Sequence, residues 1–219
     1  MWLDARLRYE ITRFDPSQNV VPWRVDVKVP ADIDALPPGA PSSFSVGRIM
    51  ADELRRYELD EWGSDCLETA DADSVGLEMA VASLLDADGE LRLDEYECIC
   101  DPIVYIYRLE IHPDFADYRL AVLDAFCRLF NTDALILAQY KTTWFSLTEF
   151  QSLGFQPLKP KLVSYDPKRL ESETELLFIV RDNTLKCDFE IANYPKSMPS
   201  ATAEHESWLE AQSNWKVFF

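Results

Sequence analysis

The sequence predicts an α/β (α+β) fold, a sheet flanked by helices, with a C-terminal extension. Residues 5–14 and 23–29 alternate apolar and polar side chains, which is the period of a half-buried strand, and residues 44–51 predict another strand. Residues 102–111 are nearly all apolar or aromatic, as expected of a strand covered on both faces. From about residue 117 to 130 the apolar residues recur with helical spacing. Such a succession is typical of a sheet with helices packed on it.

One further helix is predicted before residue 102. Residues 30–43 are rich in Pro, Asp, Ala and Ser and predict a loop. The charged stretch 52–62 is compatible with the end of a strand, a loop or a short helix. Between residues 71 and 85 the apolar period becomes helical, and residues 86–89 then predict a turn. The expected buried face is Val75, Met79, Ala82 and Leu85, and the expected N-cap is Asp71 or Asp73.

The second half of the chain continues the alternation of helices and strands. The helix from about residue 117 is expected to bury Val122, Phe126 and Leu129. A buried strand follows at 133–140, and then a short helix at 144–153 that Gly154 closes. Residues 156–165 and 175–181 predict a terminal strand pair.

The C-terminal residues depart from this order. We divide the chain into a domain at 1–182 and an extension at 183–219, in which residues 201–214 predict a helix. The apolar residues of that extension include Trp208, Leu209, Trp215, Phe218 and Phe219. The sequence leaves two alternatives open: the extension packs back on the domain, or it docks on a partner, where aromatic anchors are favoured.

The net charge restricts the classes of partner. The chain has 39 Asp and Glu against 21 Lys and Arg, a formal net charge of −18. A surface this acidic repels phosphate backbones and anionic membranes, so direct nucleic-acid or membrane binding is disfavoured. The negative charge keeps the protein soluble, or it attracts a basic protein partner. In the second case the chain could also mimic the charge of nucleic acid and occupy a basic groove that normally binds it.

The cysteines predict a reducing compartment. Their number is odd, no apolar signal segment precedes them, and no stretch reaches the length of a membrane helix. We therefore expect a cytoplasmic protein with reduced thiols. Cys98 and Cys100 are expected in a strand as buried apolar thiols, and because His112 and His205 lie far away in sequence, we expect no metal site. The five cysteines are Cys66, Cys98, Cys100, Cys127 and Cys187.

Two motifs carry a resemblance to a known family. Residues 108–115 (RLEIHPDF) join a buried strand to a helix, and residues 150–158 (FQSLGFQPL) end a late helix in a Leu-Gly-Phe turn. With their order and separation, residues 102–181 resemble the GNAT N-acetyltransferase superfamily. The resemblance implies a mixed, mainly antiparallel sheet. It also implies an acyl-CoA pyrophosphate held by the backbone N–H groups and the dipole of the helix after the strand.

The residues of that cofactor turn depart from the family pattern. The family places a basic residue and glycines there, in the form [Q/R]-x-x-G-x-[G/A], so that the backbone can approach the phosphates. Here Ala116–Ala121 contain no glycine. Asp117 stands at a glycine position, where we expect it to cap the helix in its first turn, and Arg119 replaces the second glycine.

The candidate catalytic residues depart from the pattern as well. Phe150 stands where many family members have the tyrosine that protonates the leaving thiolate. The resemblance makes Glu110 the base of an active enzyme, and it places cofactor contacts at Leu109, Ile111 and Arg119. His112 is interpreted as a turn residue before proline.

The sequence thus predicts a GNAT-like protein without a cofactor, which binds a macromolecular and basic partner and is not catalytic. The alternative is an N-acetyltransferase that uses acetyl-CoA to modify an amine, with Tyr140, Tyr105 or Tyr107 as a displaced acid. Tyr105 and Tyr107 are expected to fill the sheet faces. The oligomeric state is left open.

Overall fold

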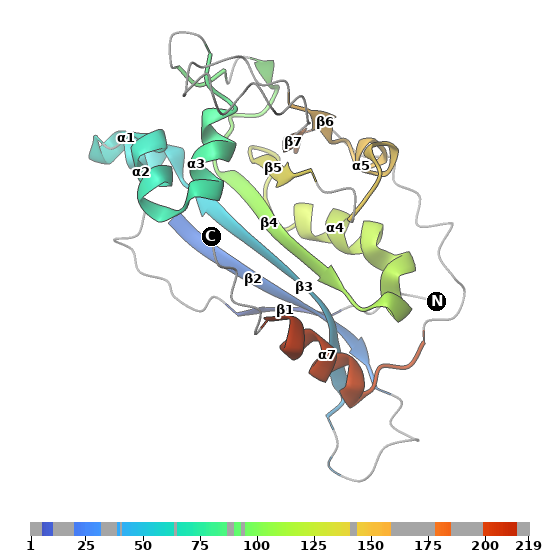
Figure 1. Ribbon diagram of the computed structural model, residues 1–219. Coiled ribbons are helices and arrows are strands. Elements are labelled where there is room, and N and C mark those ends of the chain that lie inside the picture. Colours follow the sequence, from blue (N-terminus) through green and yellow to red (C-terminus); the bar gives the residue numbers. More distant parts are fainter. Residues whose placement is uncertain are drawn as a thin grey trace, which may run out of the picture.

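The computed structural model describes residues 6–10, 20–31, 39, 41–63, 65–86, 90–92, 95–140, 144–158, 178–184 and 199–213. Seven strands form one sheet in the order β1-β2-β3-β4-β5-β7-β6 (Figure 1). Every neighbouring pair is antiparallel except β4 and β5, which run parallel. The predicted α/β (α+β) class with a mixed, mainly antiparallel sheet is confirmed. The strands are β1 (Arg6–Glu10), β2 (Val20–Pro30), β3 (Ser43–Leu54), β4 (Ile103–Ile111), β5 (Leu135–Gln139), β6 (Gln156–Pro157) and β7 (Phe178–Asp182).

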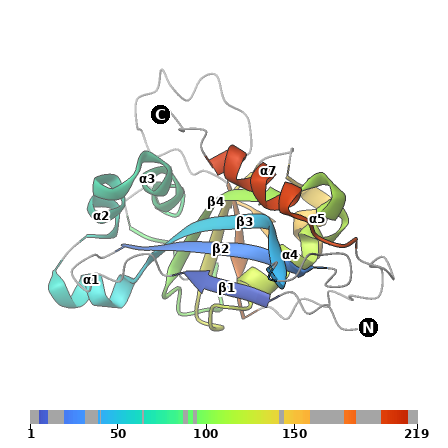
Figure 2. The same ribbon diagram turned by 90° about the horizontal axis from the view of Figure 1, so that it is seen from below.

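Helices cover both faces of this sheet. The helices α1, α2, α3 and α7 lie on one face, with α1 to α3 at one end and α7 at the other, and α4 lies on the opposite face (Figure 2). No helix within the described ranges is long and apolar enough to cross a membrane. The helices are α1 (Arg56–Trp62), α2 (Cys66–Asp73), α3 (Val75–Ala82), the 3-10 helix η3 (Pro113–Tyr118), α4 (Arg119–Cys127), α5 (Leu147–Ser152) and α7 (Ala203–Ser213).

The sheet separates two apolar cores. The first core lies between the sheet and the helices α4 and α5, and its members include Ile49, Val104, Leu123, Phe126 and Phe150. The second core lies under α1, α2 and α3, and its members include Leu54, Leu59, Leu77, Tyr105 and Leu137. Each fully buried side chain of this size contributes about 1.5–3 kcal/mol, so the two cores are the main source of stability.

Residues 66–82 form two helices, α2 and α3, where one helix was predicted at 71–85. Ser74 is extended and its hydroxyl accepts a hydrogen bond from the N–H of Leu77 at 3.2 Å, so α3 begins there. Asp65 caps the preceding helix α2. The prediction of Asp71 or Asp73 as the N-cap is therefore wrong, because both lie in the last turn of α2.

The predicted buried face is wrong for Val75 and Met79, whereas Leu85, just past the end of α3, is buried as predicted and Ala82 is partly buried. Val75 is 59% exposed and Met79 is 44% exposed. The helix turns a different side to the sheet, and Gly76 lies against the ring of Tyr105. A Cβ atom at Gly76 would lie 3.3 Å from the Tyr105 hydroxyl oxygen, which is tighter than ordinary van der Waals contact, so glycine favours this close approach. The buried residues of α3 are Leu77, Ala80 and Val81.

Between residues 102 and 140 the predicted strand, helix and strand are confirmed as β4, α4 and β5. Val122 and Phe126 are buried as expected, and Leu129 is partly buried. Cys98 and Cys100 are buried, but they lie in an irregular segment before β4 and not in the predicted strand. Of the predicted terminal strand pair, β6 and β7 are present, and residues 159–177 lie outside the described part.

Helix α7 packs back on the sheet. The predicted helix at 201–214 is confirmed, and its residues contact β3. Leu209 is 1% exposed, and Ala201 forms a parallel bridge to Ala31 just before the helix. At the end of α7 the Gln212 carbonyl accepts a hydrogen bond from the Arg108 guanidinium at 2.9 Å. Residues 199–213 of the extension therefore pack back on the domain, which is the first of the two alternatives.

The buried position of Leu209 predicts that Leu209→Ala loosens α7. The loss of a buried leucine in a core costs about 2–5 kcal/mol, and α7 can detach without unfolding the sheet. We expect faster limited proteolysis within α7 and a lower urea midpoint. Ser207→Ala, on an exposed position of the same helix, is the control. Equal cleavage rates in wild type, Leu209→Ala and Ser207→Ala would contradict the docking of α7.

Candidate functional site

The candidate site lies where β4 ends and the crossover to β5 begins. Parallel strands cannot be joined by a tight hairpin, so the chain leaves the end of β4 through η3 and α4 before it returns in β5. Gly47 of β3 lets the two strands approach there, because a Cβ atom would lie 2.7 Å from the Glu110 carbonyl oxygen. Phe115 is 2% exposed and anchors η3 in the first core.

Arg119 is held by two groups at the start of α4. It is the only Lys or Arg between His112 and Cys127. Its guanidinium donates one hydrogen bond to the Ala116 carbonyl at 3.0 Å and pairs with the Glu149 carboxylate of α5. The guanidinium thus bridges η3 and α5, and a bound phosphate would have to displace a carboxylate from it.

Glu149 is itself fixed by the end of its helix. Its carboxylate accepts a hydrogen bond from the Ser146 N–H at 2.8 Å, and the Ser146 hydroxyl accepts one from the Glu149 N–H. Burial acts to raise the pKa of Glu149, but the hydrogen bonds from Ser146 and the charge of Arg119 outweigh it, so the pKa lies below its usual value. Glu149 is therefore ionised at neutral pH and keeps Arg119 in place.

Asp117 does not cap α4, which corrects the prediction from the sequence. The helix begins at Arg119, its N-cap is Tyr118, and no side chain accepts a hydrogen bond at the cap. Asp117 lies in η3 with its side chain exposed. The 3-10 helix places Phe115 and Tyr118 three residues apart on its buried side, and this leaves Asp117 on the outside.

The other residues expected in the cofactor site lie on two faces of β4. Leu109 is 7% exposed and belongs to the first core, and Ile111 packs against that core. Glu110 points to the opposite face, since successive side chains of a strand alternate. There its carboxylate pairs with Arg108 at 2.7 Å, and Arg108 also donates to α7. The structure therefore separates Glu110 from Arg119.

Phe150 is a core residue. It is 1% exposed, and its ring packs edge-on against the rings of Phe145 and Phe155 with centroid distances of 4.9 and 5.6 Å. Tyr140 follows β5, and its ring centroid lies 6.1 Å from that of Phe150. Tyr105 and Tyr107 lie on the second core, as predicted.

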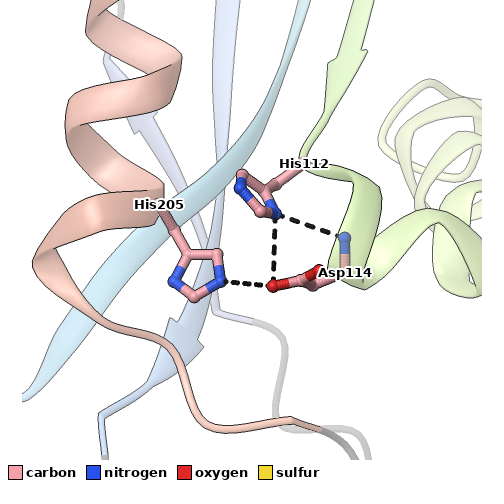
Figure 3. A group of neighbouring side chains, drawn as sticks. All are labelled: His112, Asp114 and His205. Carbon is pink, nitrogen blue, oxygen red and sulfur yellow. Dashed lines mark hydrogen bonds and ion pairs between the residues drawn. The ribbon is translucent and has the colours of Figure 1, made fainter.

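The two histidines of the chain meet at this corner, which the sequence did not predict. Their ring centroids are 4.3 Å apart, although the residues are separated by 93 positions. The Asp114 carboxylate accepts a hydrogen bond from the ring of His205 at 3.2 Å, and the Asp114 N–H donates to Nδ1 of His112 at 3.2 Å (Figure 3). No local spacing joins residues from β4 and α7, so only a prediction of the docked helix could have found this cluster.

Both rings also cap the elements from which they come. The Thr202 N–H donates to Nδ1 of His205 at 3.0 Å, and Nδ1 of His112 caps η3. Burial and the neighbouring ring of His205 lower the pKa of His112, although Asp114 acts in the opposite direction. His112 is therefore neutral at pH 7, as an acceptor at Nδ1 has to be.

A buried carboxyl group lies farther along β3. Asp52 is 7% exposed, and burial together with the charge of Asp73 raises its pKa to about 7. Tyr105 and Tyr107 face the same carboxyl group, and burial followed by the charge of Asp52 raises the pKa of each. Asp52 is thus half protonated near neutral pH, unlike an ordinary aspartate.

The helices on one face of the sheet form an acidic face, which we define as the exposed side of α1, α2, α3 and α7 (Figure 2). Arg56 is the only Lys or Arg in these four helices, and it bonds to Asp60 and to the Ile99 carbonyl. The exposed apolar side chains of Tyr57, Val75 and Met79 lie on the same helices. The acidic residues are Glu58, Asp60, Glu61, Glu68, Asp71, Asp73, Glu78, Glu204, Glu206 and Glu210.

Comparison of the chain with protein-family models, curated proteins and solved structures finds no significant match. The function has to be argued from the residues of the corner at the end of β4 and from the acidic face.

The raised pKa of Asp52 predicts a pH-dependent effect of Asp52→Asn. The folded protein holds a proton up to about pH 7, whereas the unfolded chain releases it near the ordinary value of 3.8. The stability that Asp52 contributes is therefore full below about pH 4 and is lost as the pH rises through 7. Asparagine resembles the protonated form, so its advantage over wild type should grow between pH 5 and 8.

Thermal melts at pH 5 and 8 measure this difference, and we expect the melting temperature of Asp52→Asn to gain a few degrees on wild type. Asp117→Asn, at an exposed carboxylate, is the control. An advantage of Asp52→Asn that is the same at both pH values would show that Asp52 is ionised like a surface aspartate.

Proposed function

We propose that this chain is a GNAT-like protein with a degenerate acyl-CoA site, which is not catalytic and binds a basic macromolecular partner through the acidic face. The observation that carries the proposal is the pairing of Arg119 with Glu149 and with the Ala116 carbonyl. An acyl-CoA pyrophosphate needs an uncommitted cation and bare backbone at this helix start. Here the cation is neutralised and the turn has side chains in place of glycines.

The residues that would perform the chemistry support the same conclusion. Phe150 is buried and has no proton to donate. The Glu110 carboxylate pairs with Arg108, which α7 in turn holds through the Gln212 carbonyl. A general base needs access to the amine that it deprotonates, and here the carboxylate lies beneath a docked helix.

The charge of the acidic face favours a basic protein as the partner. The acidic face has ten carboxylates, of which Glu58 is paired with Arg55 and Asp60 with Arg56. This excess of negative charge attracts a cationic surface and repels nucleic acid and anionic lipid. Tyr57, Val75 and Met79 add exposed apolar area, which gives such an interface affinity beyond electrostatic attraction. We place this binding in the cytoplasm, where the buried cysteines remain thiols.

Calorimetric titration with acetyl-CoA tests the cofactor part of this proposal. We expect no saturable heat up to millimolar ligand and no rise in melting temperature. Binding would be easy to detect, since a ligand at 100 times its Kd adds about 2.7 kcal/mol to the free energy of unfolding. Saturable micromolar binding would instead support the alternative function, an acetyl-CoA-dependent N-acetyltransferase that acts on an amine.

The double variant Asp117→Gly and Glu149→Gln tests whether the turn and its ion pair prevent binding. It restores bare backbone at residue 117 and removes the carboxylate that neutralises Arg119. We expect measurable coenzyme A binding in this variant, with a modest loss of stability of about 1 kcal/mol from the part-exposed ion pair. Asp114→Asn, in the same 3-10 helix, is the control and should bind no more than wild type.

Neutralisation of the acidic face tests the partner part. Once a partner has been recovered by co-purification from native cells, its affinity for this chain should fall as the salt concentration rises. The affinity should also be lower for the double variant Glu68→Gln/Asp71→Asn than for wild type. Asp117→Asn/Asp133→Asn removes the same charge outside this face and should leave the affinity near that of wild type. Equal losses in both double variants would show that net charge acts alone and that the acidic face is not the binding surface.

A further inference from the structure

We propose that His112, Asp114 and His205 form a site for a divalent transition metal ion, with Zn²⁺ as the best fit, that fastens α7 to the end of β4. The ligand set is two imidazole nitrogens and one carboxylate oxygen, which suits zinc and related ions. The three residues come from the end of β4, from η3 and from α7. This inference is independent of the binding function proposed above.

The distances between the ligand atoms suit a small cation. The Asp114 Oδ2 atom lies 3.2 Å from Nε2 of His205 and 3.7 Å from Nδ1 of His112 (Figure 3). Two ligands at about 2.0–2.1 Å from a tetrahedral zinc lie about 3.3 Å apart. All three ligand atoms lie within 4.8 Å of one another, so the widest pair, Nδ1 of His112 and Nε2 of His205, has to close by at most about 1.5 Å. That movement has to come from the two imidazole rings, and Asp114, on an exposed turn, can follow them.

The surroundings allow both rings to offer a lone pair. Nδ1 of His112 is already unprotonated, because it accepts the Asp114 N–H, and on metal binding that amide can turn to water. Nε2 of His205 donates to Asp114, so its proton has to move to Nδ1 of the same ring. Nδ1 then no longer accepts the Thr202 N–H, which has to turn to water, and the Thr202 hydroxyl, 2.9 Å from that Nδ1, accepts a hydrogen bond from it instead. The net protonation of the imidazole does not change, and the hydroxyl orients the ring from its far side.

The rings around the cluster form an apolar wall on one side only. Trp208 and Phe115 pack edge-on against the histidines, with centroid distances of 5.0 Å to His112 and 5.1 Å to His205. The side chain of Asp114 is 61% exposed, so an ion can enter from its side. Three protein ligands leave one position of a tetrahedral zinc for water. Because His205 belongs to α7, a bound ion would oppose the detachment of this helix.

The test uses the full chain after treatment with a chelator. Titration with ZnCl₂ by calorimetry should give saturable binding of one ion per chain, and CoCl₂ should give the visible absorption bands of a four- or five-coordinate site. Saturating Zn²⁺ should raise the melting temperature by a few degrees and slow proteolysis within α7. The variants His112→Asn and His205→Gln should each weaken binding about tenfold or more.

These two substitutions keep the hydrogen bonds that the rings make to the backbone. Asparagine is a good N-cap for η3, and glutamine at the third position of α7 completes a capping box with Thr202. Both variants should therefore melt near the metal-free wild type, which separates lost ligation from lost folding. Asp117→Asn is the control and should bind as wild type does.

Two results would overturn the proposal. One is a wild type that binds no more Zn²⁺ than the double variant His112→Asn/His205→Gln, which would leave the histidines as caps alone. The other is binding that survives in the double variant but disappears in Cys98→Ala. That binding would show an intense thiolate-to-cobalt absorption in the near ultraviolet, and it would assign the metal to the buried thiols of Cys98 and Cys100.

Discussion

The parallel pairing of β4 with β5 is the constraint on which the architecture depends. The pairing runs from Ile103 and Leu135 to Ile106 and Ala138, and β4 then continues for five more residues. Two parallel neighbours require a crossover, and in this chain η3 and α4 form it. The end of β4, the beginning of α4 and the docked helix α7 consequently meet at one corner. The ion pairs of Arg108 and Arg119, the histidine pair and the N-terminus of α4 all lie there.

Four arginines form ion pairs with carboxylates of the sheet and the helices. Each pair sequesters one positive and one negative charge, so the net charge of −18 remains on the other side chains. Two of the pairs have arginine side chains less than a tenth exposed, where removal of one partner would leave an uncompensated charge. The pairs are Arg48 with Asp26, Arg108 with Glu110, Arg119 with Glu149 and Arg181 with Asp124.

The sequence predicted what depends on neighbouring residues, and it failed where distant contacts decide. The strand at 102–111 and the helix after it follow from composition and period, and both are present. The phase of α3 could not be predicted, because it depends on packing against distant residues such as Tyr105 of β4. The start of α4 moved for a similar reason, since burial of Phe115 and Tyr118 favours a 3-10 turn. The meeting of the two histidines depends on the docking of α7, which the sequence left open.

The distribution of cysteines gives each half of the interior its own chemical reporter. Cys127 lies in the first core, whereas Cys66, Cys98 and Cys100 lie in the second, and all four thiols are buried. A maleimide or disulfide reagent can modify them only when the side of the sheet that covers them opens. The order in which peptides become labelled under mild denaturant would therefore reveal which layer separates from the sheet first, without any engineered probe.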